Sequence, residues 1–302
     1  MNKVNISEMQ QLISSISFKY DYWQMADPGR NFILVEGETD AEFIIKSSLE
    51  QIKPIKAKSV FLEPRNCKKA ILDTFKALEQ YHPLITMPDG WEKWKLFGLI
   101  DWDYEEQETH ERFKRLFHYD RHDLETTLLS LDEDLLFEIG ISIKQQEKNK
   151  IYFMAYQLGC VNRAMYEAES FSCRISDDWV QDVFTDEGVL KVEKLIKMME
   201  ADKSTKGLSV VKISKYCSQL NRKGEWQITY SDFCDGLPLD FWDIVNGHDI
   251  GVILRFVSDE AQKKYWGHGR ELNRDFEFAL IRNFDVDKFK SSQLFKKLAA
   301  IC

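Results

Sequence analysis

Three acidic residues stand at the ends of two apolar segments that read as strands. Glu36 directly follows residues 32–35, Asp101 directly follows residues 95–100, and Asp103 lies two positions further on. In a parallel sheet, functional side chains gather where the carboxyl ends of the strands meet. The period of two in an extended chain also points Asp101 and Asp103 to the same side. We therefore expect the three carboxylates to converge at one edge of a sheet.

Converging carboxylates repel one another strongly unless a divalent cation lies between them. Ligand sets made only of oxygen favour Mg²⁺ or Mn²⁺ over zinc or copper. A simpler interpretation is that each acid caps the helix that follows its strand, as acidic residues commonly do. Because the acids come from two separate strands, we favour a site for Mg²⁺ or Mn²⁺.

The apolar pattern around these acids predicts alternating strands and helices. Residues 9–16 carry apolar side chains at helical spacing, and Pro28-Gly29 interrupts this pattern. Thr39 and Glu42 form a capping box that opens a second helix. We expect strands at 32–35, 59–62 and 95–100, with helices through 39–49 and 71–78 between them. This alternation is the signature of a doubly wound parallel sheet.

The second half of the chain has a different pattern. Apolar residues recur at helical spacing over 124–136, 151–158 and 189–199, while 203–207 reads as an exposed loop. A section rich in aromatic residues follows from about 225, and the chain closes with a helix at 291–301. We therefore predict an α/β protein with a doubly wound, mostly parallel sheet in residues 1–135 and a largely helical accessory region in residues 136–302.

Charge is unevenly distributed along the chain, whose formal net charge is −9. Residues 101–138 hold 13 acidic against 4 basic side chains, and residues 191–224 hold 9 basic against 3 acidic. One acidic and one basic segment would suit a metal-dependent enzyme with a polyanionic substrate, although a pair of solvated charged helices gives the same pattern.

The composition is that of a globular protein, with 302 residues, 44% hydrophobic and 30% charged. The apolar runs are too short to cross a bilayer, and the first residues lack the apolar stretch of a signal peptide. The six cysteines form no CxxC or CxxH pair, which is typical of reduced thiols. We expect a cytoplasmic protein that does not act at a membrane.

Four short motifs together resemble a known family. FILVEGETD at 32–40 and FGLIDWD at 97–103 resemble the TOPRIM pattern, in which a glutamate at a strand end precedes a DxD motif on a later strand. YDRHDLE at 119–125 and NGHD at 246–249 are similar to motifs of TOPRIM-like effectors in bacterial anti-phage loci, including PARIS-type systems. The turn at 63–69 departs from the pattern because it lacks the expected glycine.

The resemblance implies roles for individual residues. Glu36 would bind metal and manage the proton on the attacking or leaving oxygen, while Asp101 and Asp103 would hold Mg²⁺ directly. Glu125 would complete a position for a second ion, with His122 or Asp123 in support. Two ions suit phosphodiester cleavage because both the attacking and the leaving oxygen need stabilisation.

Local patterns offer other interpretations of some of these residues. His122 and Glu125, three positions apart, would share one helical face, but His122 could equally be a capping or structural histidine. Asp123 fits the N-cap of the helix that follows, and Asp40 fits the first turn of its helix. The His248-Asp249 pair could support a metal site or simply begin a helix, and we favour the helix start.

Two groups of basic residues could bind nucleic-acid phosphates. The first group lies at a helix N-terminus, where backbone amides also attract phosphate, and the second lies in the basic segment. The residues are Arg65, Lys68 and Lys69 in the first group, and Lys212 and Lys215 in the second.

The resemblance implies a toxic effector nuclease that a partner ABC-type ATPase holds inactive until infection. By analogy it would cleave tRNA rather than DNA and would act as a homodimer. Alternatives are a DNA endonuclease of the OLD type and a non-catalytic docking module on the same fold. ATPase activity of this chain is not expected, because it contains no GxxxxGK(S/T) loop. A dehalogenase-type phosphatase is also not expected, because it would need its DxD motif on the first strand, whereas Asp101 and Asp103 follow the third expected strand.

Overall fold

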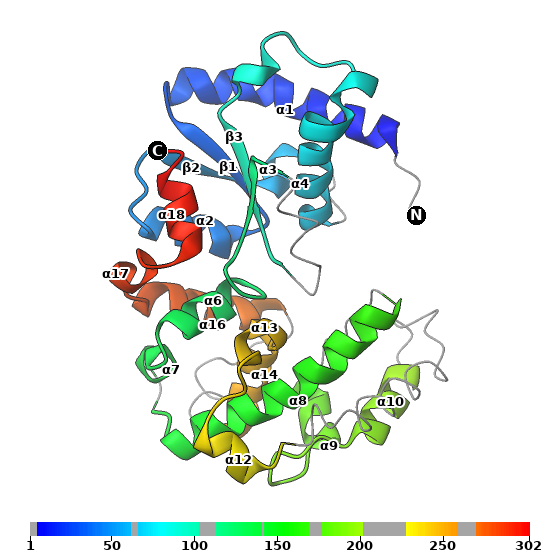
Figure 1. Cartoon of the computed structure of the whole chain (residues 1–302), viewed down its shortest axis with the longest axis vertical. Coiled ribbons are helices and arrows are strands. Elements are labelled where there is room, and N and C mark those ends of the chain that lie inside the picture. Colours follow the sequence, from blue (N-terminus) through cyan, green and yellow to red (C-terminus); the bar gives the residue numbers. More distant parts are fainter. Residues whose placement is uncertain are drawn as a thin grey trace. The chain divides into compact units, whose positions relative to one another are not determined.

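The computed structural model describes residues 5–61, 66–102, 113–140, 142–169, 177–201, 228–258 and 270–302 (Figure 1). The chain divides into two compact units. The first comprises Met1–Asp120 with Asp285–Cys302, and the second comprises Arg121–Phe284. The predicted loop at 203–207 lies outside the described residues.

The first unit is built on a four-stranded sheet in which every neighbouring pair is parallel. The spatial order is β2-β1-β3-β4. This confirms the predicted α/β class with a parallel sheet. The strands are β1 (Asn31–Val35), β2 (Ile52–Lys56), β3 (Leu96–Ile100) and β4 (Leu116–His118).

The first and third predicted strands are confirmed, but the second was placed wrongly. The first two residues of the predicted strand, 59 and 60, belong to the short helix α3 (Ala57–Val60), and the strand itself is Ile52–Lys56. The sequence of this strand contains Pro54, and a proline argues against a strand because it has no N–H to donate to the ladder. β2 lies at one edge of the sheet, and an edge position tolerates the missing N–H.

Helices cover both faces of this sheet (Figure 1). On one face, α1 (Ile6–Ala26) and α4 (Cys67–Lys76) bury a core that includes Phe32 and Leu34 of β1. Side chains alternate along a strand, so Ile33 and Val35 face the other way. There α2 (Glu38–Lys46) places Phe43 against Phe289, with ring centroids 4.8 Å apart.

The start of α2 differs from the predicted capping box at Thr39 and Glu42. Its N-cap is Gly37, whose N–H donates to Oδ2 of Asp40 at 2.8 Å. The carboxylate of Asp40 therefore satisfies a backbone donor at the helix N-terminus. Glu42, the predicted partner of Thr39, is exposed on the helix surface.

The C-terminal segment belongs to the first unit rather than to the helical region. Both oxygens of Asp120 accept backbone N–H groups, from Gln293 and Leu294, each at 2.8 Å. The division therefore differs from the predicted boundary after residue 135, since 121–135 join the second unit and 285–302 join the first. The last helices are α17 (Val286–Phe289) and α18 (Gln293–Ala299).

Short helical turns connect α4 to β3. They are a π-helical turn at Ala77–Tyr81 and 3-10 turns at His82–Leu84 and Trp91–Lys93.

Every regular element among the described residues of the second unit is a helix, and one isolated bridge pairs Phe184 with Leu190. This confirms the expected helical second half. No helix within the described residues has the length and apolar character that crossing a membrane requires. The helices are α6 (Leu124–Leu131), α7 (Leu135–Glu138), α8 (Gln145–Glu169), α9 (Asp177–Val183), α10 (Val192–Ala201), α12 (Tyr230–Asp235), α13 (Phe241–Ile244), α14 (Gly247–Val257) and α16 (Arg270–Asn283).

Close packing of α4 on β3 depends on Gly98. A Cβ there would lie 2.5 Å from Phe75 and 2.8 Å from Leu116. We expect Gly98→Ala to lower the free energy of unfolding by about 1–3 kcal/mol, because the core must shift to accept the methyl group. Urea unfolding of the full chain measures this. Gly236→Ala is the control, since nothing lies within 4 Å of its added Cβ, and equal stability of both variants would contradict this packing.

Candidate functional site

Two of the three predicted carboxylates lie together in the first unit. Glu36 follows β1 and Asp101 follows β3, and these strands pair in parallel. Oε1 of Glu36 accepts the backbone N–H of Asp101 at 3.2 Å. Both side chains are only half-buried, so solvent reaches them. Asp103 lies outside the described residues, and its part in the site remains a prediction.

A buried phenol lies among the same acids. The Tyr119 hydroxyl donates to Oδ1 of Asp40 at 2.5 Å, while Oδ2 of Asp40 accepts the N–H of Gly37. Burial, followed by the charges of Asp40, Asp101 and Glu36, raises the pKa of Tyr119 well above its usual value. The phenol therefore stays protonated as a donor, and the three carboxylates concentrate negative charge around it.

The donor set at this sheet edge fits a hard cation such as Mg²⁺. Asp40 is buried and both of its oxygens accept hydrogen bonds inside the fold, whereas the half-buried side chains of Glu36 and Asp101 are reached by solvent. Both offer oxygen, which Mg²⁺ and Mn²⁺ prefer. Burial and then the charge of Glu36 also raise the pKa of the Cys67 thiol at the start of α4, which keeps this neighbour in its neutral form.

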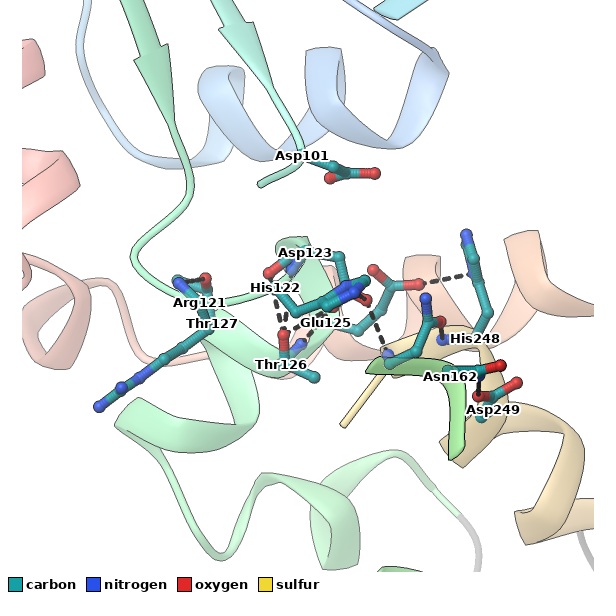
Figure 2. A network of polar contacts seen from close by, with 12 residues as sticks. Asp101, Arg121, His122, Asp123, Glu125, Thr126, Thr127, Asn162, His248 and Asp249 are labelled. Carbon is teal, nitrogen blue, oxygen red and sulfur yellow. Dashed lines mark hydrogen bonds and ion pairs between the residues drawn. The ribbon is translucent and has the colours of Figure 1, made fainter. Parts of the chain in front are cut away.

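Asp123 is the N-cap of α6, as predicted, and it also joins two helices of the second unit (Figure 2). Oδ1 accepts the backbone N–H of Thr126 at 2.8 Å, while Oδ2 accepts the N–H of Gly247 at 2.7 Å. Burial opposes the charged form, but His122 and then His248 outweigh it and lower the pKa of Asp123 to about 2. A buried, ionised carboxylate thus holds the start of α14 against α6.

Glu125 takes part in a cluster within the second unit (Figure 2). Nδ1 of His248 lies 3.0 Å from Oε1 of Glu125 and 3.3 Å from Oε1 of Glu277. One ligand atom from each of the three residues lies within 4.8 Å of the others, so this cluster could hold a metal ion. Burial alone would lower the pKa of His248, but the charges of Glu125, Glu277 and Asp123 raise it to about 10.

The structure changes the expected neighbours of Glu125. His122 precedes the N-cap Asp123 and is not part of α6, so the expectation that His122 and Glu125 share a helical face is wrong. Nδ1 of His122 lies 3.3 Å from Asp123 instead. His248 does begin a helix, α14, as favoured, and at the same time contacts Glu125. Glu277 has no sequence signal, because only tertiary packing brings α16 to this place.

The predicted phosphate-binding residues are placed only in part. Arg65, Lys212 and Lys215 lie outside the described residues. Lys68 and Lys69 lie in the first turn of α4, as expected. Nζ of Lys69 is 2.7 Å from Asp73 and 3.3 Å from Glu8. The side chain is 55% exposed, but its ammonium group already has two anionic neighbours.

Comparisons with known proteins do not assign a family to the chain. No protein-family model matches it, and no curated protein matches it. The resemblance to TOPRIM-like proteins therefore rests on the four motifs and remains a prediction.

The low pKa of Asp123 predicts a specific dependence of stability on pH. A carboxylate whose pKa is lower in the folded state stabilises the fold above its unfolded pKa of about 3.9, and this contribution disappears as the pH falls through the folded value. The difference in unfolding free energy between wild type and Asp123→Asn should therefore shrink by about 2 kcal/mol between pH 5 and pH 2.

Urea unfolding at stepped pH measures this difference. The exposed Asp134, which caps α7 without a side-chain hydrogen bond, supplies the control Asp134→Asn. A difference that stays constant over the whole pH range for Asp123→Asn would show that its carboxylate is not held ionised by the fold.

Proposed function

We propose that this chain is a Mg²⁺-dependent nuclease of the TOPRIM type, with Glu36 and Asp101 as its central carboxylates. The observation that carries this proposal is the contact between Oε1 of Glu36 and the backbone N–H of Asp101 at the carboxyl edge of a parallel sheet. Asp103 adds a third carboxylate two residues further along the sequence.

Phosphodiester hydrolysis places negative charge on the attacking oxygen, the leaving oxygen and the phosphoryl group. A divalent ion held by Glu36 and Asp101 would stabilise that charge. Glu36 would in addition accept the proton of the attacking water, because its carboxylate is half-exposed and lies at the sheet edge. Tyr119 keeps Asp40 in place by donating to it, which fixes the first turn of α2 beside the reacting groups.

The biological setting of the proposal rests on the motifs at 119–125 and 246–249. We propose a toxic effector of an anti-phage system that cleaves tRNA, stays inactive beside a partner ABC-type ATPase, and acts as a homodimer. The basic segment at 191–224, with 9 basic against 3 acidic residues, gives a polyanionic substrate a place to bind. RNA is favoured over DNA by analogy alone.

The nuclease proposal predicts that single carboxylate changes abolish cleavage. Purified full chain is incubated with Mg²⁺ and either total tRNA or plasmid DNA, alone and together with the partner ATPase and its trigger. Glu36→Gln and Asp101→Asn should each reduce cleavage by about 100-fold or more, because each removes charge that acts on the transition state. The exposed Glu42 on α2 supplies a matched control, and Glu42→Gln should cleave normally.

Two outcomes would contradict the proposal. The first is that neither polymer is cut in any of these conditions, and the second is that Glu36→Gln cuts as fast as wild type. Cleavage of plasmid DNA but not of tRNA would keep the nuclease and reject the proposed substrate.

A further inference from the structure

Three titratable side chains from three helices meet inside the second unit. Glu125 comes from the first turn of α6, His248 from the first turn of α14, and Glu277 from the middle of α16. α14 packs against both other helices. Glu125 is 4% exposed, Glu277 12% and His248 23%. The cluster is therefore largely buried, yet solvent reaches it on the side of His248.

The backbone is shaped to bring these groups together. Asp123 lies two positions before Glu125 in the sequence, and its carboxylate accepts the N–H of Gly247. This hydrogen bond fixes the start of α14 close to Glu125. A Cβ on Gly247 would overlap Glu125 and would lie 2.7 Å from Oδ1 of Asp123. Only glycine allows this approach, and it places the imidazole of His248 directly beside the carboxylate of Glu125.

The spacing of the ligand atoms suits a bound ion. Metal bonds from Zn²⁺ or Mn²⁺ to imidazole nitrogen and carboxylate oxygen are about 2.1 Å long, which sets neighbouring ligand atoms about 3.0–3.4 Å apart. Nδ1 of His248 lies 3.0 Å from one glutamate oxygen and 3.3 Å from the other. Small movements of the three side chains would therefore complete the site.

The contact between His248 and Glu125 is close but poorly formed as a hydrogen bond. Nδ1 of His248 and Oε1 of Glu125 are both buried, and neither makes a hydrogen bond of acceptable geometry. Buried polar atoms normally have a well-aligned partner. An ion between them would satisfy both atoms, and an ion pair without metal would leave their alignment poor.

We propose that Glu125, His248 and Glu277 form a site for a divalent transition-metal ion, of the class of Zn²⁺, Mn²⁺ or Fe²⁺. The imidazole ligand decides the class, because Mg²⁺ prefers oxygen and keeps most of its water, whereas transition metals bind imidazole well. Three protein ligands leave further positions for water or a substrate oxygen. This proposal needs only the second unit and stands whether or not the first unit is a nuclease.

The test uses Co²⁺ as a probe, bound to the chelator-treated full chain in a large excess of Mg²⁺. We expect one Co²⁺ per chain, with visible absorption bands and without the near-ultraviolet band that thiolate ligands produce. Glu277→Gln and His248→Gln should each weaken binding about tenfold or more, because each removes a ligand. His82→Gln, an exposed histidine of the first unit, and Glu36→Gln should leave binding unchanged.

Several results would overturn the metal site. They are the absence of a Mg²⁺-resistant Co²⁺ ion in wild type, a thiolate band in its spectrum, or folded His248→Gln and Glu277→Gln chains that bind like wild type. If the variants do not fold, ¹⁵N-histidine spectra of the wild type decide the matter. Added Zn²⁺ must then shift the ring-nitrogen signals of a single histidine, and the same shift must occur in His82→Gln. Spectra that Zn²⁺ leaves unchanged would reject the site.

Discussion

The parallel pairing of β1 with β3 is the constraint on which the proposed active site depends. Because both strands run in the same direction, both end at one edge, and the residues that follow them, Glu36 and Asp101, meet there. The neighbouring features maintain this edge. Gly98 lets α4 pack against β3, and Asp40 fixes the start of α2 while it accepts the hydroxyl of Tyr119. A shift of one strand relative to the other would separate the two carboxylates.

Much of this edge could be predicted from sequence because its signals are local. Continuous apolar runs mark buried parallel strands, and they identified β1 and β3 together with the acids that follow them. The same rule failed at β2, where Pro54 interrupts the run. It also gave no prediction of β4, because Leu116–His118 is too short to show a pattern. The N-cap role of Asp123 was predicted correctly, since capping depends only on neighbouring residues.

The surroundings of Glu125 could not be predicted in the same way. Spacing along a helix suggested His122 as its companion, but the helix begins only at Leu124, and Glu125 is in contact with the imidazole of His248, far along the chain. Glu277 lies on a strongly charged helix in which no single acid stands out. Such contacts follow from the packing of whole helices, which local patterns do not encode.

The two units surround their acids with different partners. At the sheet edge backbone N–H groups and a phenol donate hydrogen bonds to the acids but leave their negative charge in place, which suits a hard, oxygen-binding cation. In the second unit a histidine lies between two glutamates, which suits a softer ion. Different ligand types in one chain therefore favour different metals at the two places.

Mn²⁺ binding measured by electron paramagnetic resonance tests the magnesium site most directly, because bound Mn²⁺ can be counted even if the nuclease is held inactive. We expect wild type to bind Mn²⁺ that Mg²⁺ displaces. The double variant Glu36→Gln/Asp101→Asn should lose this Mg²⁺-displaceable ion, while Glu42→Gln keeps it. If the double variant binds as many Mg²⁺-displaceable ions as wild type, the sheet edge is not the magnesium site.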